Sequence, residues 1–231
     1  MGYHLDMSKY FIMLDKLSLT QLFGKITKVN GMMLESEVPD TSIGSICRIY
    51  SKERDKSIDA ETLGFRNKKV MLMPLNDLRG VGPGSIVKEI DKNAGLEVGP
   101  GLLGRIVDGL GFPIDGKGPI PTEEKYPIYK EPTNPILRPR INEIVETGIR
   151  SIDGLLTVGC GQRIGIFSGS GIGKSNMLGM IARHSLADVN VIGLIGERGR
   201  EVNEFIENVL GEVGLIKSIV IAAKSDYACL I

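Results

Sequence analysis

The sequence predicts an α/β protein, in which a small N-terminal β-barrel is followed by a second domain built on a parallel sheet. Between Leu22 and Ile90, short apolar runs are separated by frequent turn formers, which is typical of a small barrel. From Arg163 onward, apolar runs of strand length alternate with segments of helical periodicity. This alternation, with its short links, predicts parallel strands joined by right-handed crossovers. The expected parts are an N-terminal arm at 1–21, the barrel at 22–91 and the second domain at 92–231.

The barrel region contains one strong turn signal. Asn30-Gly31 stands between two runs that contain apolar residues, and because both residue types tolerate positive φ, the dipeptide predicts a β-hairpin. Further strands are expected at Ser45–Tyr50, Glu61–Phe65, Lys69–Leu75 and Ser85–Ile90. Between Gly95 and Pro121 glycine and proline become dense, which predicts a compact connection without regular elements.

The second domain is expected to contain buried strands and two helices. The strands are predicted at Arg163–Phe167, Val189–Ile195 and Ser218–Ala222. The helix that begins near Lys174 is apolar nearly all round, so it should be buried beside the sheet, and it should end near His184. A further helix is predicted over Glu201–Leu210, because apolar residues recur there at i, i+3, i+4 and i+7.

A glycine-rich turn connects the first of these strands to its helix. Gly169, Gly171 and Gly173 let the backbone turn sharply and point several N–H groups into one concavity, to which the positive end of the helix adds. Lys174 can reach terminal phosphates, and the Ser175 hydroxyl can ligate Mg²⁺. The pattern is that of the phosphate-binding loop G-x-x-x-x-G-K-[ST], except that Ser168 replaces the first glycine. The predicted nucleotide-binding residues are Ser168, Gly169, Ser170, Gly171, Ile172, Gly173, Lys174, Ser175 and Asn176.

A second polar cluster, at residues 196–201, follows the next predicted strand. Since the carboxyl ends of neighbouring parallel strands share one crevice, Glu197 should project from the same sheet edge as the loop. A carboxylate there can orient or polarise a water for in-line attack on a γ-phosphate. Arg198 could stabilise charge on the transferred phosphoryl group or contact a neighbouring subunit, and Glu201 could hold Arg198 or a metal-bound water. The alternative is a helix N-terminus that simply carries charged residues.

Composition argues against several other classes of function. Lys+Arg and Asp+Glu both number 28 among the 231 residues, so the zero net charge gives no indication of a nucleic-acid surface. No apolar run reaches bilayer-spanning length and the first residues lack a signal-peptide pattern, so a cytoplasmic protein is expected. Cys47, Cys160 and Cys229 are isolated and odd in number, which argues against a disulfide framework or a zinc site. They are expected to be small, mostly buried hydrophobes.

In the segments Gly101–Asp108, Phe167–Ser175 and Gly193–Val202, the sequence closely resembles the flagellar and type III secretion export ATPases, which are relatives of the catalytic subunits of rotary ATP synthases. The resemblance implies that the barrel has six strands and helps to build a hexameric ring, and that the remainder is the start of a RecA-like ATPase core. It also implies that Lys174 and Ser175 bind phosphates and Mg²⁺ and that Glu197 is the catalytic carboxylate.

The resemblance further implies a function and a set of partners. The family uses ATP hydrolysis to separate export substrates from their chaperones and to help feed the export gate, at the cytoplasmic face of the inner membrane. ATP is then the substrate and Mg²⁺ the cofactor. The expected partners are further copies in a homohexamer, a stator-like regulatory protein, the export gate, substrate–chaperone complexes and the membrane surface, without nucleic acid.

Two alternatives remain open at this point. Members of that family continue well beyond this length, with a strand that positions the Mg²⁺ water and an arginine that reaches the adjacent subunit. The chain is therefore expected to be truncated at its C-terminal end, and it could act as a non-hydrolysing nucleotide-binding or ring-assembly module. It could also be the catalytic subunit of another rotary ATPase, although Ser175 and the run Arg198–Glu201 argue against that interpretation.

Overall fold

The computed structural model describes residues 22–38, 40–51, 56–92, 94–169 and 171–224. Its contacts divide the chain into two compact units, with the division between Lys92 and Asn93. The domain limits 22–91 and 92–231 remain predictions, and the expected arm at 1–21 lies outside the described residues. No helix among the described residues is long and apolar enough to cross a membrane.

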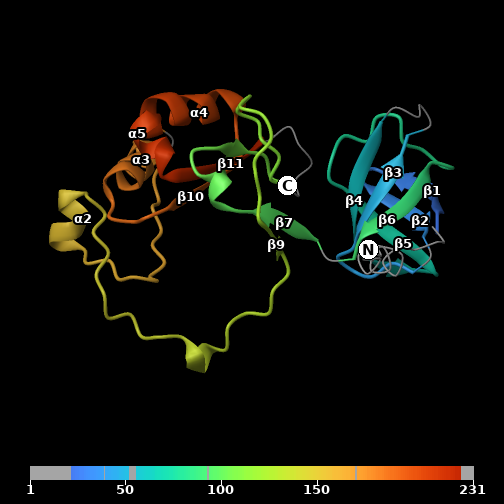
Figure 1. The fold of residues 1–231 in the computed structure, drawn as a ribbon, viewed down its shortest axis with the longest axis horizontal. Coiled ribbons are helices and arrows are strands. Elements are labelled where there is room, and N and C mark those ends of the chain that lie inside the picture. Colours follow the sequence, from blue (N-terminus) through green and yellow to red (C-terminus); the bar gives the residue numbers. More distant parts are fainter. Residues whose placement is uncertain (1–21, 39, 52–55, 93, 170, 225–231) are drawn as a thin grey trace, which may run out of the picture. The chain divides into compact units, whose positions relative to one another are not determined.

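The first unit contains a closed, antiparallel barrel of six strands in the order β1-β2-β5-β4-β3-β6 (Figure 1), as the resemblance implied. Its strands are β1 Gly24–Asn30, β2 Met33–Glu37, β3 Ile46–Tyr50, β4 Ser57–Arg66, β5 Lys69–Pro74 and β6 Ile86–Asp91. Inward residues from all six strands form the core, and Leu34, Ile49, Leu72 and Val87 are fully buried. Closure leaves the barrel without free strand edges, so its backbone groups pair within the unit.

The predicted hairpin is present, and its turn lies one residue further along than the Asn-Gly pattern suggests. Asn30 is the last residue of β1 and pairs with Met33, so Gly31 and Met32 form the two-residue turn. Gly31 has φ 58°, which a residue with a Cβ adopts only with strain. A second tight hairpin joins β4 and β5 through Asn67 and Lys68, which have φ 50° and 61°. Positive φ at both positions is the pattern of a type I′ turn.

The second unit holds a parallel sheet in the order β10-β11-β8. Strand β10 spans Asn190–Glu197, β11 spans Ser218–Lys224 and the short β8 spans Ile106–Val107. An antiparallel pair, β7 Gly95–Val98 and β9 Glu124–Pro127, lies in the same unit. The prediction that 95–121 lacks regular elements is therefore wrong, because β7 pairs with β9 and β8 pairs with Val220 and Ile221 of β11.

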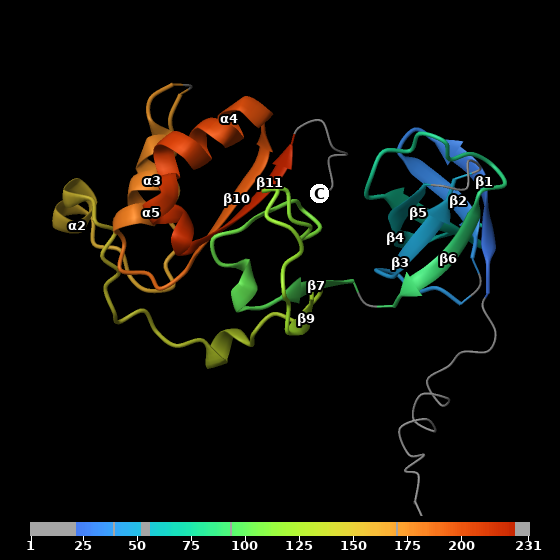
Figure 2. The same cartoon turned by 45° about the horizontal axis from the view of Figure 1, so that its top comes forward.

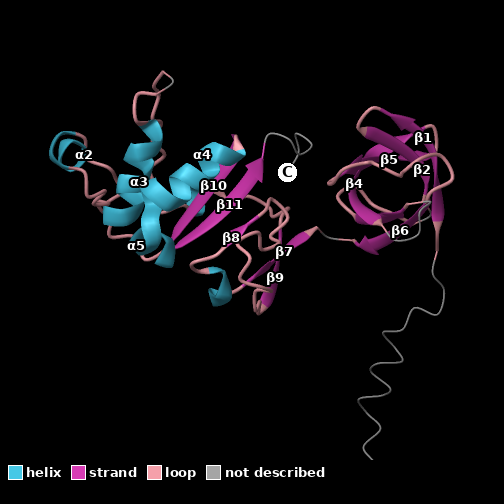
Figure 3. Ribbon diagram, turned by 90° about the horizontal axis from the view of Figure 1, so that it is seen from above, coloured by secondary structure: helices cyan, strands magenta, loops and turns pink. Residues whose placement is uncertain are grey.

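Four helical segments in the described part of this unit lie on one face of β10 and β11 (Figures 2 and 3). They are α3 Lys174–His184, α4 Gly199–Glu204, a π-helical turn Phe205–Leu210 and α5 Gly211–Ile216. Helix α2 Arg150–Leu155 lies apart from this face, and 3₁₀ turns occur at Pro100–Leu102 and Pro135–Leu137. The helix predicted over Glu201–Leu210 is present, and helical structure extends over 199–216. Ala182, Phe205, Leu210 and Val220 form the buried core between helices and sheet.

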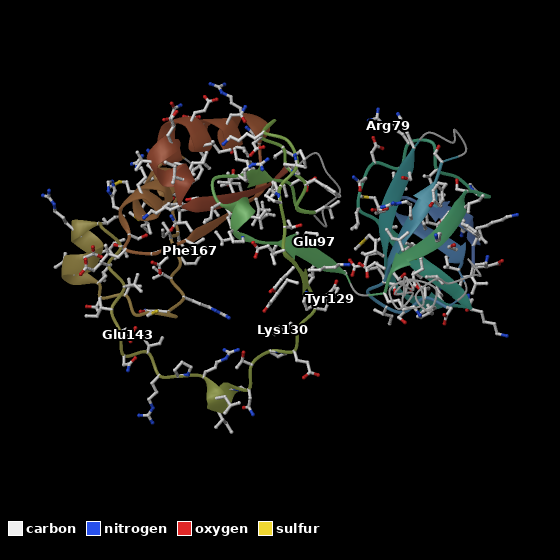
Figure 4. All side chains as sticks on the ribbon, in the orientation of Figure 1. Arg79, Glu97, Tyr129, Lys130, Glu143 and Phe167 are labelled. Carbon is white, nitrogen blue, oxygen red and sulfur yellow. The ribbon has the colours of Figure 1, made fainter. Side chains whose placement is uncertain are left out.

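The predicted burial of the second unit is wrong in three places. Arg163–Phe167 is not a strand: no described strand pairs with it, and Phe167 is 96% exposed (Figure 4). Strand β10 is not buried on both faces, because the helices cover only one, and Val191 on the other is 67% exposed. Helix α3 packs against the π-helical turn rather than lying deep beside the sheet, and Leu178 on it is 44% exposed.

The cysteines differ from one another in environment. Cys47 is buried in the barrel, as expected, whereas Cys160 is exposed, which contradicts the prediction of a buried residue. Cys160 lies in the turn at 159–162, outside both cores, so no side-chain packing covers it. Cys229 lies outside the described residues.

Candidate functional site

The glycine-rich loop leads directly into α3. Gly173 precedes the first helical residue, Lys174, and its φ of 94° lies in the left-handed region. Gly171 also has positive φ, and a Cβ placed on either glycine would meet no atom within 4 Å, so open space faces the loop. Helix α3 is 11 residues long, enough to bring the positive end of a helix dipole to this space. The loop geometry is therefore suited to an anion.

A cavity of about 500 Å³ lies against the loop. It is lined by residues of the loop, of the start of α3, of the end of β10, and of α4 with the π-helical turn. They are Ser168, Gly169, Gly171, Ile172, Gly173, Lys174, Ser175, Asn176, Leu194, Glu197, Glu201, Val202, Glu204, Phe205 and Val209. The structure thus brings Glu197 to the predicted phosphate-binding residues, with Ser170 outside the described part of the chain.

The charges of this cavity are unequal, since Glu197, Glu201 and Glu204 face one ammonium group, that of Lys174. A hydrogen bond with Glu201, burial, and the negative charge of Glu201 raise the pKa of the Glu197 carboxyl, while the positive charge of Lys174 acts in the opposite direction. Two carboxyl groups in contact destabilise one another's charged form, so a proton is held more tightly here than on an isolated glutamate.

The roles expected of Arg198 and Glu201, the neighbours of Glu197, stay predictions, and the structure shows where the two residues lie. Arg198 is the residue before α4, is exposed, and is not among the residues that line the cavity. Glu201, which was expected to hold Arg198 or a metal-bound water, lines the cavity together with Glu197. Glu204, Phe205 and Val209 were not predicted as site residues. Their spacing from Glu201 along one helical face, at i+3, i+4 and i+8, was the signal available in the sequence.

The donor set fits a magnesium–polyphosphate complex. Among the described residues there is no group of three or more His, Cys, Asp or Glu side chains placed to hold a metal ion. Mg²⁺ is commonly bound by one or two protein oxygens together with substrate phosphates and waters. The hydroxyl of Ser175, next to Lys174 and the open loop, is suited to be such a ligand.

Comparison with protein families identifies the class to which this fold and site belong. Residues 26–90 match the ATP synthase alpha/beta family, beta-barrel domain. Residues 148–231 match the ATP synthase alpha/beta family, nucleotide-binding domain. The chain belongs to the ATP synthase alpha/beta family.

Within that family the chain is similar to export ATPases. It is 47% identical over 215 residues to the flagellum-specific ATP synthase of Bacillus subtilis (strain 168), covering 90% of this chain and 48% of that protein. It is 42% identical over 217 residues to the type 3 secretion system ATPase of Xanthomonas euvesicatoria, and that match covers 94% of this chain and 49% of the relative.

Solved structures give the same result. The assembled ATPase EscN in complex with its central stalk EscO, from the enteropathogenic E. coli type III secretion system, matches with a TM-score of 0.79 and 38% sequence identity. That match covers 88% of this chain and 49% of EscN. The chain spans about half the length of the curated relatives it matches.

Proposed function

We propose that this chain binds Mg·ATP at the loop of residues 168–176, as part of an ATPase that energises flagellar or type III protein export. The observation that carries the proposal is the single cavity in which the glycine-rich loop, Lys174 and Glu197 meet. The similarity to flagellum-specific ATP synthases and to a type 3 secretion system ATPase supports export as the purpose of hydrolysis.

Each group has a distinct role in the proposed reaction. The N–H groups of the loop and the ammonium of Lys174 bind and orient the phosphates, and the Ser175 hydroxyl is the protein ligand for Mg²⁺. When bound, Mg²⁺ supplies positive charge between the phosphate oxygens. Glu197 accepts a proton from the attacking water, and a raised pKa makes a carboxylate a more effective base near neutral pH. Arg198, which lies outside the cavity lining, is assigned to charge stabilisation across a contact with a neighbouring copy.

The assembly we propose follows the relatives. EscN is described as an assembled ATPase with a central stalk, and we infer a homohexameric ring and a stalk partner for this protein. A stator-like regulator, the export gate and substrate–chaperone complexes complete the proposed partners. The proposed location is the cytoplasmic face of the inner membrane.

A second function is favoured by one observation. The segment Arg163–Phe167, which leads to the loop, is unpaired among the described strands and exposes Phe167. A loop supported on one side only can bind nucleotide and still hold the phosphates too loosely for in-line attack, since catalysis needs sub-ångström positioning. In that case the chain is a nucleotide-binding or ring-assembly module without turnover.

The deciding experiment measures Mg·ATP binding by calorimetry and phosphate release on the same purified sample. Lys174→Ala should weaken binding at least tenfold and abolish any phosphate release, because it removes the cavity's ammonium group. Lys130→Ala is the matched control, since Lys130 is exposed and lies outside the cavity lining. Binding with turnover supports the ATPase. Binding without turnover supports the nucleotide-binding module. A folded chain without binding contradicts both the ATPase and the nucleotide-binding module, and leaves only a role in ring assembly.

A further inference from the structure

The C-terminal end of α3 is fixed to the elements around it by side-chain hydrogen bonds. Asn190, the first residue of β10, donates through Nδ2 to the carbonyl oxygen of Ala182 at 2.8 Å. Lys217, which precedes β11, donates through Nζ to the carbonyl oxygen of Ser185, also at 2.8 Å. Ala182 belongs to the buried core of the unit. Arg183 therefore starts from a backbone position that is held firmly against the sheet.

Arg183 connects this helix end to the π-helical turn Phe205–Leu210. Its Nη1 donates a hydrogen bond to the carbonyl oxygen of Val209. Gly211, two residues later, has φ 64°, so the regular helical path is interrupted there, and arginine side chains commonly donate to carbonyl groups near such an end. The stem of Arg183 is also closely packed, because a Cβ at Gly214 of α5 would lie 3.0 Å from its Cγ.

The turn that Arg183 contacts forms part of the nucleotide cavity. Phe205 and Val209 of the turn line the cavity, as do Glu201 and Glu204 of α4, which continues directly into the turn. We call these two glutamates the acidic wall. A Cβ at Gly179 of α3 would lie 3.0 Å from the carbonyl oxygen of Val209, so the helix and the turn approach closely at this point. The place of the acidic wall relative to α3 therefore depends on the contacts of Val209.

We propose that Arg183 is a positioning residue for the nucleotide cavity: by holding the carbonyl group of Val209, it keeps the π-helical turn and the acidic wall in place relative to Lys174 and Ser175. The inference rests on the proposed function and deepens it, since it names a residue that sets the geometry of that same site. Arg183 is not among the residues that line the cavity, so it acts through Val209.

A fixed acidic wall has a consequence for the ligand. Carboxylates beside the loop repel the phosphates of a nucleotide that lacks a metal ion, because charges of the same sign repel at short range. A nucleotide whose phosphate charge is offset by Mg²⁺ is repelled less. The wall should therefore favour Mg·ADP over metal-free ADP, and displacement of the wall should reduce that preference.

The first part of the test follows the contact in the protein without nucleotide. Val209 Cγ1 lies against the position that a Cβ of Gly179 would take, so NMR should show a nuclear Overhauser effect between the Gly179 α-protons and a Val209 methyl group. The effect should weaken in Arg183→Met, which keeps a long stem without the donor. It should persist in Arg183→Lys, whose ammonium can donate to the carbonyl group. Arg150→Met, at an exposed arginine of α2, is the matched control.

The second part measures the Kd of ADP by calorimetry with and without Mg²⁺. Arg183→Met should raise the Kd of Mg·ADP about two- to tenfold, the range that one hydrogen bond normally contributes, and should change the Kd of metal-free ADP less. Gly179→Ala, which pushes Val209 away from α3, should act in the same direction. Partial unfolding would weaken both forms of the ligand by the same factor, so the ratio of the two Kd values distinguishes positioning from stability.

The outcomes separate this inference from the proposed function. A parent chain that binds no ADP contradicts the proposed function, and the inference that rests on it is then overturned too. If the parent chain binds ADP, an unchanged Overhauser effect or an unchanged ratio of Kd values in Arg183→Met overturns the inference alone. An Arg183→Lys chain that behaves like Arg183→Met also overturns it, since the donated hydrogen bond would not explain the effect. A changed ratio in Arg183→Met and Gly179→Ala, with the parental ratio in Arg183→Lys and Arg150→Met, supports it.

Discussion

Different single residues are expected to determine whether the cavity binds nucleotide and whether the bound nucleotide is hydrolysed. Lys174 interacts with phosphate in every state of the proposed reaction, whereas Glu197 is needed only when a water attacks. Their effects on the nucleotide are opposite in sign, because one contributes positive charge and the other negative charge to the same cavity. Substitutions at the two positions should therefore have different consequences for binding and for turnover.

Glu197→Gln should keep or strengthen Mg·ATP binding and reduce phosphate release by about 10²–10⁴-fold, the usual contribution of a general base. The amide keeps the shape of the side chain and removes both its charge and its ability to accept a proton from water. Calorimetry and a phosphate-release assay on one sample check both parts. A variant that binds tenfold more weakly, or turns over at the parental rate, would show that Glu197 is not the base.

An ion pair between two single residues connects the position before β8 with the segment that follows β8. Arg105 donates to both carboxylate oxygens of Asp115, with Nε 2.6 Å from Oδ2, and the Asp115 side chain is only 2% exposed. The hydrogen bonds from Arg105 are the main cause that lowers the pKa of Asp115 well below its usual range. A carboxyl whose folded-state pKa is lowered stabilises the fold above its unfolded-state pKa, and that contribution is lost as pH falls through the folded-state value.

Asp115→Asn should therefore lower the free energy of unfolding at pH 7, and its difference from the parent chain should shrink as pH falls below about 4, the ordinary carboxyl range. Urea unfolding between pH 7 and pH 3 measures the difference. Glu131→Gln, which removes an exposed carboxylate of the same unit, should leave stability nearly unchanged. A constant difference at every pH would show that packing, rather than the ion pair, accounts for the loss.

Among the elements, those that pair locally were the ones the sequence could predict. The hairpin at Asn30-Gly31 and strands β3, β5 and β6 were found close to their predicted limits, because local turn chemistry and apolar runs determine them. Strand β4 begins at Ser57, earlier than the predicted Glu61. The segment Arg163–Phe167 has the composition of a buried strand, but a strand forms only where another strand offers hydrogen-bond partners. Short β8, among glycines and prolines, was missed because its pairing with β11 is a long-range contact.

The site shows the same division between local and long-range information. The loop and Glu197 were predictable, since a motif identifies the loop and Glu197 stands at the end of a predicted strand. The part played by Phe205 and Val209 in the cavity depends on how the π-helical turn packs on α3. Periodicity indicates which face of a helix is apolar, but it does not indicate which neighbour covers that face.

The six strands of the barrel share one apolar core, and buried residues such as Leu72 stabilise it. Leu72 on β5 is fully buried and lies opposite Leu34 of β2 and Thr62 of β4. Leu72→Ala should cost about 2–5 kcal/mol, because it removes buried methyl groups and leaves a cavity. Amide hydrogen exchange of β1–β6 measures the loss. Leu63→Ala, at a position 38% exposed in β4, should cost much less, and an equal loss would contradict the role of the core.

At the scale of the whole molecule, the proposed nucleotide-binding residues all come from the second unit, so a bound ligand should stabilise that unit. The residues that line the cavity lie between Ser168 and Val209, within the second unit. A ligand that binds only the folded state stabilises it by RT ln(1 + [L]/Kd), which is about 2.7 kcal/mol at a hundredfold excess over Kd. That stabilisation should be unevenly distributed along the chain.

Addition of Mg·ADP should slow amide hydrogen exchange in the loop, in α3 and around the junction of β10 with α4, and leave β1–β6 unchanged. The reason is that the phosphates are proposed to contact loop N–H groups directly, and the residues that line the cavity belong to the second unit. The same measurement on Lys174→Ala should show no protection, while Lys130→Ala should behave like the parent chain. Protection confined to the barrel strands would place the nucleotide away from the loop and contradict the proposed site.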